Sequence, residues 1–210
     1  MVLTLYGNVH STCTARVRTV LEELSLAHEF VEVDFSKPAV LKSPEVLAVQ
    51  PFGQIPYIDD AGFKLFESRA ICRYLALKYG GVGKGLVPDP SDREKTALFD
   101  QAASIEVSNF DPPASGLGFE NIVKQYIPGL EADPAMVAKY KFQLEQKMEG
   151  YDRLLSRQKF MAGDELTIID LFHLPWGAML KRQGNDILES DKFPNVKSGF
   201  HSSLMGEDLR

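Results

Sequence analysis

The first eighty residues of the chain contain short apolar runs of strand length and stretches in which apolar side chains recur at helical spacing. Residues 2–6 form an apolar run of strand length, and the Gly7-Asn8 pair after it favours a turn. Beyond residue 12, apolar side chains recur at spacings of three and four residues, which places them on one face of a helix. They are Val17, Val20, Leu21 and Leu24. Apolar and acidic residues then alternate over positions 31–35, which predicts a second strand.

A second group of short elements follows a stretch that contains two prolines. Residues 36–49 are typical of a loop with a brief helix. Residues 55–59 and 63–66 predict two strands joined by a turn at 60–62, where Gly62 permits a positive φ. A further apolar stripe predicts a helix that ends at Gly80-Gly81. The order strand, helix, strand, short helix, two strands and helix is that of a thioredoxin-like domain.

The strand patterns end before residue 91. Residues 81–90 are rich first in glycine and then in proline, so they predict a linker that is flexible and then stiff. Residues 91–210 show helical spacing and predict an all-α domain after the thioredoxin-like domain of residues 1–80. We expect the first helix of this second domain to be interrupted near 112–118, where two prolines and two glycines occur.

Composition and charge exclude several classes of function. The 210 residues are 44% hydrophobic and 25% charged, which is enough apolar material for two small cores. A net charge of −6 argues against nucleic-acid binding, which needs a basic face. We expect no membrane partner, because no apolar run approaches the length that spans a bilayer. The four histidines show no metal-ligand spacing, and two distant cysteines fit a reducing, cytoplasmic location.

Two nearby segments carry the strongest chemical signal. The first, Gln50-Pro-Phe-Gly-Gln-Ile-Pro56, ends in an X-Pro bond, the only kind for which the cis form is accessible at about 0.5–1 kcal/mol. A cis turn would direct the Ile55 backbone groups outward, where they can pair with a peptide-like ligand. The second segment places Glu67 and Ser68 where a strand leads into a helix, and free backbone N–H groups there attract a carboxylate. Together they predict a receptor for a small, charged, extended peptide.

Four separated motifs agree in order and spacing with one known family. They are residues 2–12, the pair of segments at 50–56 and 65–74, Asn109-Phe-Asp-Pro-Pro113, and residues 162–171. They resemble the cytosolic glutathione transferases, and most of all the phi class of plants and fungi. The resemblance covers about nine tenths of the chain and fades after Val196. It implies a thioredoxin-like N-terminal domain followed by an all-helical C-terminal domain, which is the glutathione transferase fold.

The resemblance implies an enzyme with glutathione as cosubstrate and no metal. Such an enzyme adds the glutathione thiolate to apolar electrophiles or reduces organic hydroperoxides. Free thiols have a pKa of about 8.5, so the site must favour the ionised form. Ser11 is the residue implied to do so, with a hydroxyl that donates to the sulfur at a helix N-terminus. Without the other motifs, Ser11 would be interpreted as an ordinary helix N-cap.

Two other functions remain open at this level. Cys13 lies two residues after Ser11 and is a candidate nucleophile for a glutathione thiol-transferase, because a thiol at a helix N-terminus can have a lowered pKa. A small side chain packed in the first turn of the helix is the other interpretation of Cys13. The second of the two functions is that of a non-catalytic carrier that holds hydrophobic ligands.

The resemblance also implies how the tripeptide is held. Gln54 and the Ile55 backbone would bind the cysteinyl part beside a cis Pro56, and Glu67 and Ser68 would bind the γ-glutamyl end. Lys42 would pair with the glycyl carboxylate. Its neighbours depart from the phi-class pattern: they are Leu41 and Ser43.

The second substrate is expected to be apolar and to bind in a pocket between the domains. The residues implied to line it are Val9, Thr12, Phe35, Phe110 and Ala114, although plain core packing explains each of them equally well. The family forms homodimers, so we expect a homodimer here. The tail after Val196 lacks the tryptophan-rich helix that is usual in the family.

Overall fold

The structure is a computed structural model that describes residues 2–34 and 37–205, and it divides into two compact units, residues 1–87 and 88–210. The division falls inside the predicted linker 81–90, and Leu86 and Val87, just before it, are each only 2% exposed. The glycine-rich first half of the predicted linker is therefore followed directly by two buried residues. The fold is the predicted one: a thioredoxin-like unit followed by an all-helical unit.

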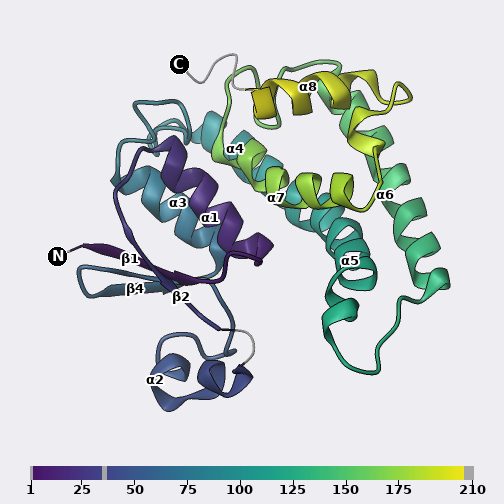
Figure 1. Ribbon diagram of the computed structural model, residues 1–210. Helices are drawn as coiled ribbons and strands as arrows, with labels where there is room; N and C mark the ends of the chain where they lie inside the picture. The colour runs from purple at the N-terminus through teal and green to yellow at the C-terminus, as the bar shows by residue number, and fades with distance from the viewer. Residues whose placement is uncertain (1, 35–36, 206–210) are drawn as a thin grey trace. The chain divides into compact units, whose positions relative to one another are not determined.

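A four-stranded sheet with the order β2-β1-β3-β4 forms the centre of the first unit (Figure 1). Its strands are β1 (Leu3–Gly7), β2 (Glu29–Glu32), β3 (Tyr57–Asp60) and β4 (Phe63–Phe66). Strand β1 pairs parallel with β2 and antiparallel with β3. Leu5 of β1 and Ile58 of β3 face each other in the ladder and are completely buried, so the two central strands supply the core of the sheet.

Helices α1 (Thr12–Glu23) and α3 (Ser68–Lys78) lie side by side on one face of this sheet (Figure 1). The predicted stripe of α1 is buried, from Val17 to Leu24, because it packs against the sheet and α3. The short 3₁₀ helix Pro38–Lys42 and α2 (Pro44–Leu47) occupy the stretch predicted as a loop with a brief helix.

Strand β2 lies earlier in the chain than the alternation at 31–35 predicted. Its ladder runs from Thr4 opposite Glu29 to Gly7 opposite Glu32, so it ends where β1 ends. It is an edge strand, and Val31 remains 41% exposed. Phe35 lies outside the described residues.

The elements of the second unit are all helical among its described residues, and turns and loops connect them. They are α4 (Arg93–Ile105), a π-helical turn (Glu106–Phe110), α5 (Asp111–Asn121), a 3₁₀ turn (Val123–Tyr126), α6 (Pro134–Leu155), α7 (Ile168–Arg182), a 3₁₀ turn (Ile187–Glu189) and α8 (Pro194–Met205). Helix α6 buries Leu144, Met148 and Tyr151 along one stripe, as its helical spacing requires. Thr167 and Asp170 form a capping box that begins α7.

The predicted interruption near 112–118 is wrong, because these residues form α5. The π-helical turn shifts the register, with the Asp111 N–H donating to the carbonyl of Glu106, and the two prolines then fall in the first turn of α5, where helical N–H partners are not required. The two glycines permit close approach of other helices. A Cβ at Gly116 would lie 2.6 Å from the Tyr140 ring, and one at Gly118 would lie 2.4 Å from the Trp176 ring.

The tail of the chain is helical as far as it is described. Helix α8 packs against α6 and α7, and a Cβ on Gly177 of α7 would lie 2.1 Å from the Phe200 ring of α8. Among the described residues, no helix combines the length and apolar character needed to cross a bilayer.

Candidate active site

Three of the predicted segments meet at one edge of the sheet because of its register. In the ladders Tyr6 faces Tyr57, and Tyr57 faces Phe66. The end of β1, the start of β3 and the end of β4 therefore lie next to one another across the sheet. The residues just beyond these strand ends carry the turn to Ser11, the Ile55–Pro56 bond and the Glu67-Ser68 pair.

Ser11 lies at the N-terminus of α1, which the chain reaches through a tight turn. Its backbone N–H donates to the carbonyl of Asn8 at 3.0 Å, and its hydroxyl oxygen accepts from the Thr14 N–H at 3.2 Å. Ser11 is thus an N-cap, as its residue type alone predicts. The cap bond uses an oxygen lone pair, so the hydroxyl hydrogen can still donate to another group. The first turn of α1 contains no acidic residue that would oppose an anion there.

The turn before β3 has the expected backbone form. The Ile55–Pro56 peptide bond is cis, and the ladder of β3 with β1 begins one residue later at Tyr57. Pro56 is buried, Ile55 is half-buried and Gln54 is exposed. The Gln50 side chain, only 2% exposed, accepts from the Phe52 N–H at 2.7 Å and so fixes the start of the turn.

Lys42 lies against the same turn. Its Nζ donates to the carbonyl of Phe52 at 3.0 Å, and its side chain passes so close to Gly53 that a Cβ there would lie 2.6 Å from Nζ. Gly53 has a φ of +62°, which favours glycine for a second reason. The ammonium group of Lys42 is therefore held beside Gln54 while it remains exposed.

Glu67 and Ser68 form the start of α3. Glu67 has a φ of 71°, a conformation that costs a non-glycine residue on the order of 1–3 kcal/mol, and its side chain is exposed. It makes no side-chain cap bond to the helix. The Ser68 hydroxyl is buried and accepts from the Arg16 guanidinium at 2.9 Å. Arginine can only donate, so the Ser68 hydroxyl hydrogen points away from Arg16.

The two cysteines differ in accessibility. Cys13 is half-buried, and its Sγ accepts from Nη1 of the completely buried Arg16 at 3.7 Å. Cys72 is completely buried, and burial raises the pKa of its thiol to about 12. Cys72 is therefore a protonated core residue at neutral pH.

The five candidate substrate-lining residues are divided between the two units, and one of them falls outside the part of the chain that the structure describes. Val9 and Thr12 flank the turn to Ser11, and Val9 is 49% exposed. Phe35 lies outside the described residues. Phe110 and Ala114 belong to the second unit, where they are 1% and 0% exposed. They are packed side chains of that unit, so their role toward a substrate stays a prediction.

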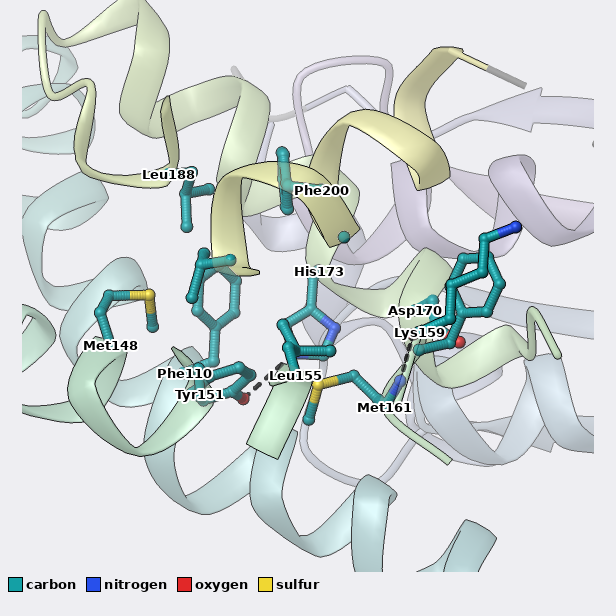
Figure 2. Close-up of a pocket in the computed structure, with 13 residues that line it drawn as sticks. Phe110, Met148, Tyr151, Leu155, Lys159, Met161, Asp170, His173, Leu188 and Phe200 are labelled. Carbon is teal, nitrogen blue, oxygen red and sulfur yellow. Dashed lines mark hydrogen bonds between the residues drawn. The ribbon is translucent and has the colours of Figure 1, made fainter. Parts of the chain in front are cut away.

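Phe110 does line a small cavity of about 40 Å³ inside the second unit (Figure 2). Its ring lies 4.8 Å from the ring of His173, measured between centroids. His173 Nδ1 is 2.8 Å from the Ile169 carbonyl and must donate to it, so Nε2 accepts from the Tyr151 hydroxyl at 3.1 Å when the ring is neutral. Burial raises the pKa of Tyr151 well above its usual value. These groups satisfy one another, which is typical of a structural core network.

Sequence interpretation missed two buried polar residues next to the site, Asn8 and Arg16. Arg16 is four residues before Val20 on the apolar stripe of α1, and a charged residue at such a position was the available signal. No group of three or more metal-ligating side chains occurs among the described residues.

Comparison with known proteins now identifies the family. The model of the glutathione S-transferase N-terminal domain matches residues 1–77, and that of the C-terminal domain matches residues 114–207. The chain therefore belongs to the glutathione S-transferase family of enzymes, with its likeness to plant phi-class and fungal members.

Three relatives illustrate the likeness. Glutathione S-transferase PM239X14 of Arabidopsis thaliana is 44% identical over 95% of this chain and 90% of its own length. Glutathione S-transferase hmp2 of Hypomyces subiculosus is 44% identical over 95% of this chain and 92% of its own. The structure of maize glutathione S-transferase I in complex with an atrazine glutathione conjugate superposes with a TM-score of 0.88 at 29% identity, covering 100% of this chain and 95% of the maize chain.

Proposed function

We propose that this protein conjugates glutathione to apolar electrophiles or reduces organic hydroperoxides with it, and that Ser11 activates the thiol. The observation that carries the proposal is the meeting of Ser11, the cis Ile55–Pro56 turn and the start of α3 at one edge of the sheet. The glutathione sulfur would lie at the N-terminus of α1, where the Ser11 hydroxyl donates to it. Both the hydrogen bond and the helix dipole favour the thiolate.

The rest of the tripeptide would extend along the same edge. The Ile55 backbone and Gln54 would bind the cysteinyl part, and the exposed Lys42 would pair with the glycyl carboxylate. The γ-glutamyl end has an amine and a carboxylate. The exposed Glu67 carboxylate would accept from the amine, while the Ser68 hydroxyl and the first N–H groups of α3 would donate to the carboxylate.

The second substrate would be an apolar molecule with an electrophilic carbon or a peroxide bond. The maize relative binds a conjugate of glutathione with atrazine, which supports carbon electrophiles with a displaceable group as one class. With such a substrate the sulfur would form a bond to the electrophilic carbon, and the leaving group would depart with the electrons of the bond that breaks. Val9, exposed beside the turn to Ser11, would contact the apolar part of such a molecule.

The Ser11→Ala variant tests the proposal. It removes the proposed donor to the sulfur, so kcat/KM with an activated aryl halide should fall on the order of 10²-fold. Losing the N-cap should cost about 1 kcal/mol of stability, too little to unfold the protein. Ser11→Thr keeps both the cap and a hydroxyl donor, and it should retain measurable activity as the matched control.

Three outcomes would contradict the proposal. Unchanged turnover in Ser11→Ala would remove Ser11 from the mechanism. Activity that survives in Ser11→Ala but disappears in Cys13→Ser would indicate a thiol-transferase. Negligible conjugation by the wild type, together with tight binding of hydrophobic dyes, would indicate a carrier.

We also propose that the protein is a homodimer, as the family resemblance implies. A single chain has a mass of 23.4 kDa, so light scattering on the purified protein should give twice that value. A mass that stays at one chain at micromolar concentration would contradict this.

A further inference from the structure

The turn that carries Ser11 is built around one buried side chain, Asn8. Asn8 directly follows β1 and is 6% exposed. Buried amides are kept only where their donors and acceptors are satisfied, because each unsatisfied group costs about 1–3 kcal/mol. In this protein the hydrogen bonds of Asn8 connect three different parts of the chain.

The side chain of Asn8 has one fixed orientation. Its Oδ1 accepts from the His10 N–H at 2.9 Å, and its Nδ2 donates to the Val33 carbonyl at 2.9 Å. A backbone N–H can only donate and a carbonyl can only accept, so the amide cannot be flipped. Aspartate would keep the first bond but lose the second.

The backbone of Asn8 holds the turn from the other side. Its N–H donates to Oγ1 of the buried Thr14 at 3.2 Å, and its carbonyl accepts from the Ser11 N–H at 3.0 Å. Thr14 also donates its own N–H to the Ser11 hydroxyl oxygen at 3.2 Å. Asn8 and Thr14 therefore fix both the backbone and the hydroxyl of Ser11.

We propose that Asn8 is a positioning residue for the conjugation reaction, one that sets the Ser11 hydroxyl by tying the turn to the first turn of α1 and to the backbone after β2. This inference rests on the proposed role of Ser11. A hydroxyl that must meet a sulfur atom needs a fixed place, since a displacement of about 1 Å can cost on the order of 10²-fold in rate. Asn8 does not touch the substrate in this scheme. Its effect reaches the sulfur through Ser11.

The test is the pKa of the glutathione thiol in the binary complex, measured by the ultraviolet absorbance of the thiolate as a function of pH. Asn8→Ala should raise this pKa by about one unit, and kcat/KM near neutral pH should fall about tenfold. The KM for glutathione should change less than about threefold, because Lys42, Gln54 and Glu67 remain in place. Asn8→Asp should also raise the thiol pKa, since it loses the bond to Val33 and brings a negative charge near the thiolate.

Two further variants separate positioning from simple stability. Thr14→Val keeps the volume of the side chain and removes the acceptor of the Asn8 N–H, so it should raise the thiol pKa in the same direction. It decides the question if Asn8→Ala does not fold. Asn121→Ala in the second unit removes a comparable side-chain bond, at 2.8 Å to Gln183, and should lower stability while leaving the thiol pKa unchanged.

A wild-type thiol pKa in folded Asn8→Ala and Thr14→Val would overturn the inference, and Asn8 would then only hold the fold. Ser11→Ala is measured beside them. If it keeps full activity, the proposed function fails; if it loses activity while the Asn8 variants do not, only the positioning role fails.

Discussion

Asp60 shows how one buried charge joins two elements of the first unit. It ends β3, is 5% exposed, and its carboxylate accepts from Lys78 at 2.6 Å, Tyr74 at 2.7 Å and Tyr79 at 2.8 Å. Burial alone raises the pKa of Asp60, but these three hydrogen bonds outweigh it and leave the pKa below its usual value. The carboxylate thus fastens the C-terminal end of α3 to the sheet.

Asp60→Asn should therefore destabilise the protein by about 2 kcal/mol at pH 7, a low value for a buried charge because the Lys78 side chain is 43% exposed. The lowered pKa contributes stability above the unfolded value of about 3.9, and this contribution is lost as the pH falls through the folded value. The stability difference between wild type and Asp60→Asn should be constant from about pH 5 to 7 and shrink below about pH 4. Urea unfolding at each pH measures it, and a difference that does not depend on pH would contradict the assignment.

At the scale of elements, the close packing of α5 against α6 and α7 requires glycine at two positions. Gly116 faces Tyr140 of α6, and Gly118 faces Trp176 of α7. Trp176 also donates from its indole N–H to Asp111 at the start of α5, at 3.1 Å. The glycines that suggested an interruption of the helix are therefore contact positions, where the α5 backbone comes close to two aromatic rings.

Gly118→Ala should destabilise the protein by about 1–2 kcal/mol. The added methyl group forces the Trp176 ring to move, at a cost of about 1–3 kcal/mol, and the better helix propensity of alanine returns part of that. Gly150→Ala is the matched control, because Gly150 is an exposed position of α6 with only the end of Arg153 near it, at 4.0 Å. It should be neutral or stabilise by up to about 1 kcal/mol. Thermal unfolding of both variants measures the contrast, and equal shifts would show that the Trp176 contact carries no strain.

At the scale of the whole molecule, local sequence patterns predicted the first unit better than the second. Strands β1, β3 and β4 and helices α1 and α3 follow from alternation, helical stripes and turn residues that lie within a few positions of one another. The position of β2 could not be predicted from local patterns, because β2 pairs with β1 and ends where β1 ends. The helical structure of residues 106–121 could not be predicted locally either, since the aromatic residues that contact its glycines are tens of residues away in the chain.

The candidate site was predictable only in part from the sequence. Its segments were found from the X-Pro bond, the strand-to-helix junction and the family resemblance, and their meeting at one edge follows only from the sheet register. Arg16 and Asn8 were not found. Polar residues inside apolar patterns reveal their importance only when their hydrogen-bond partners are known, and those partners are Ser68 and Val33, far along the chain.

Because Cys72 is buried between α1 and α3, its reactivity reports how often the first unit opens locally. Its thiol, with a pKa of about 12 and no exposed surface, cannot meet an alkylating reagent while the two helices remain packed. Alkylation of Cys72 in a Cys13→Ser background therefore requires an opening that exposes the thiol, such as transient separation of α1 from α3. The rate of alkylation, compared with that of a free thiol, gives the free energy of that opening.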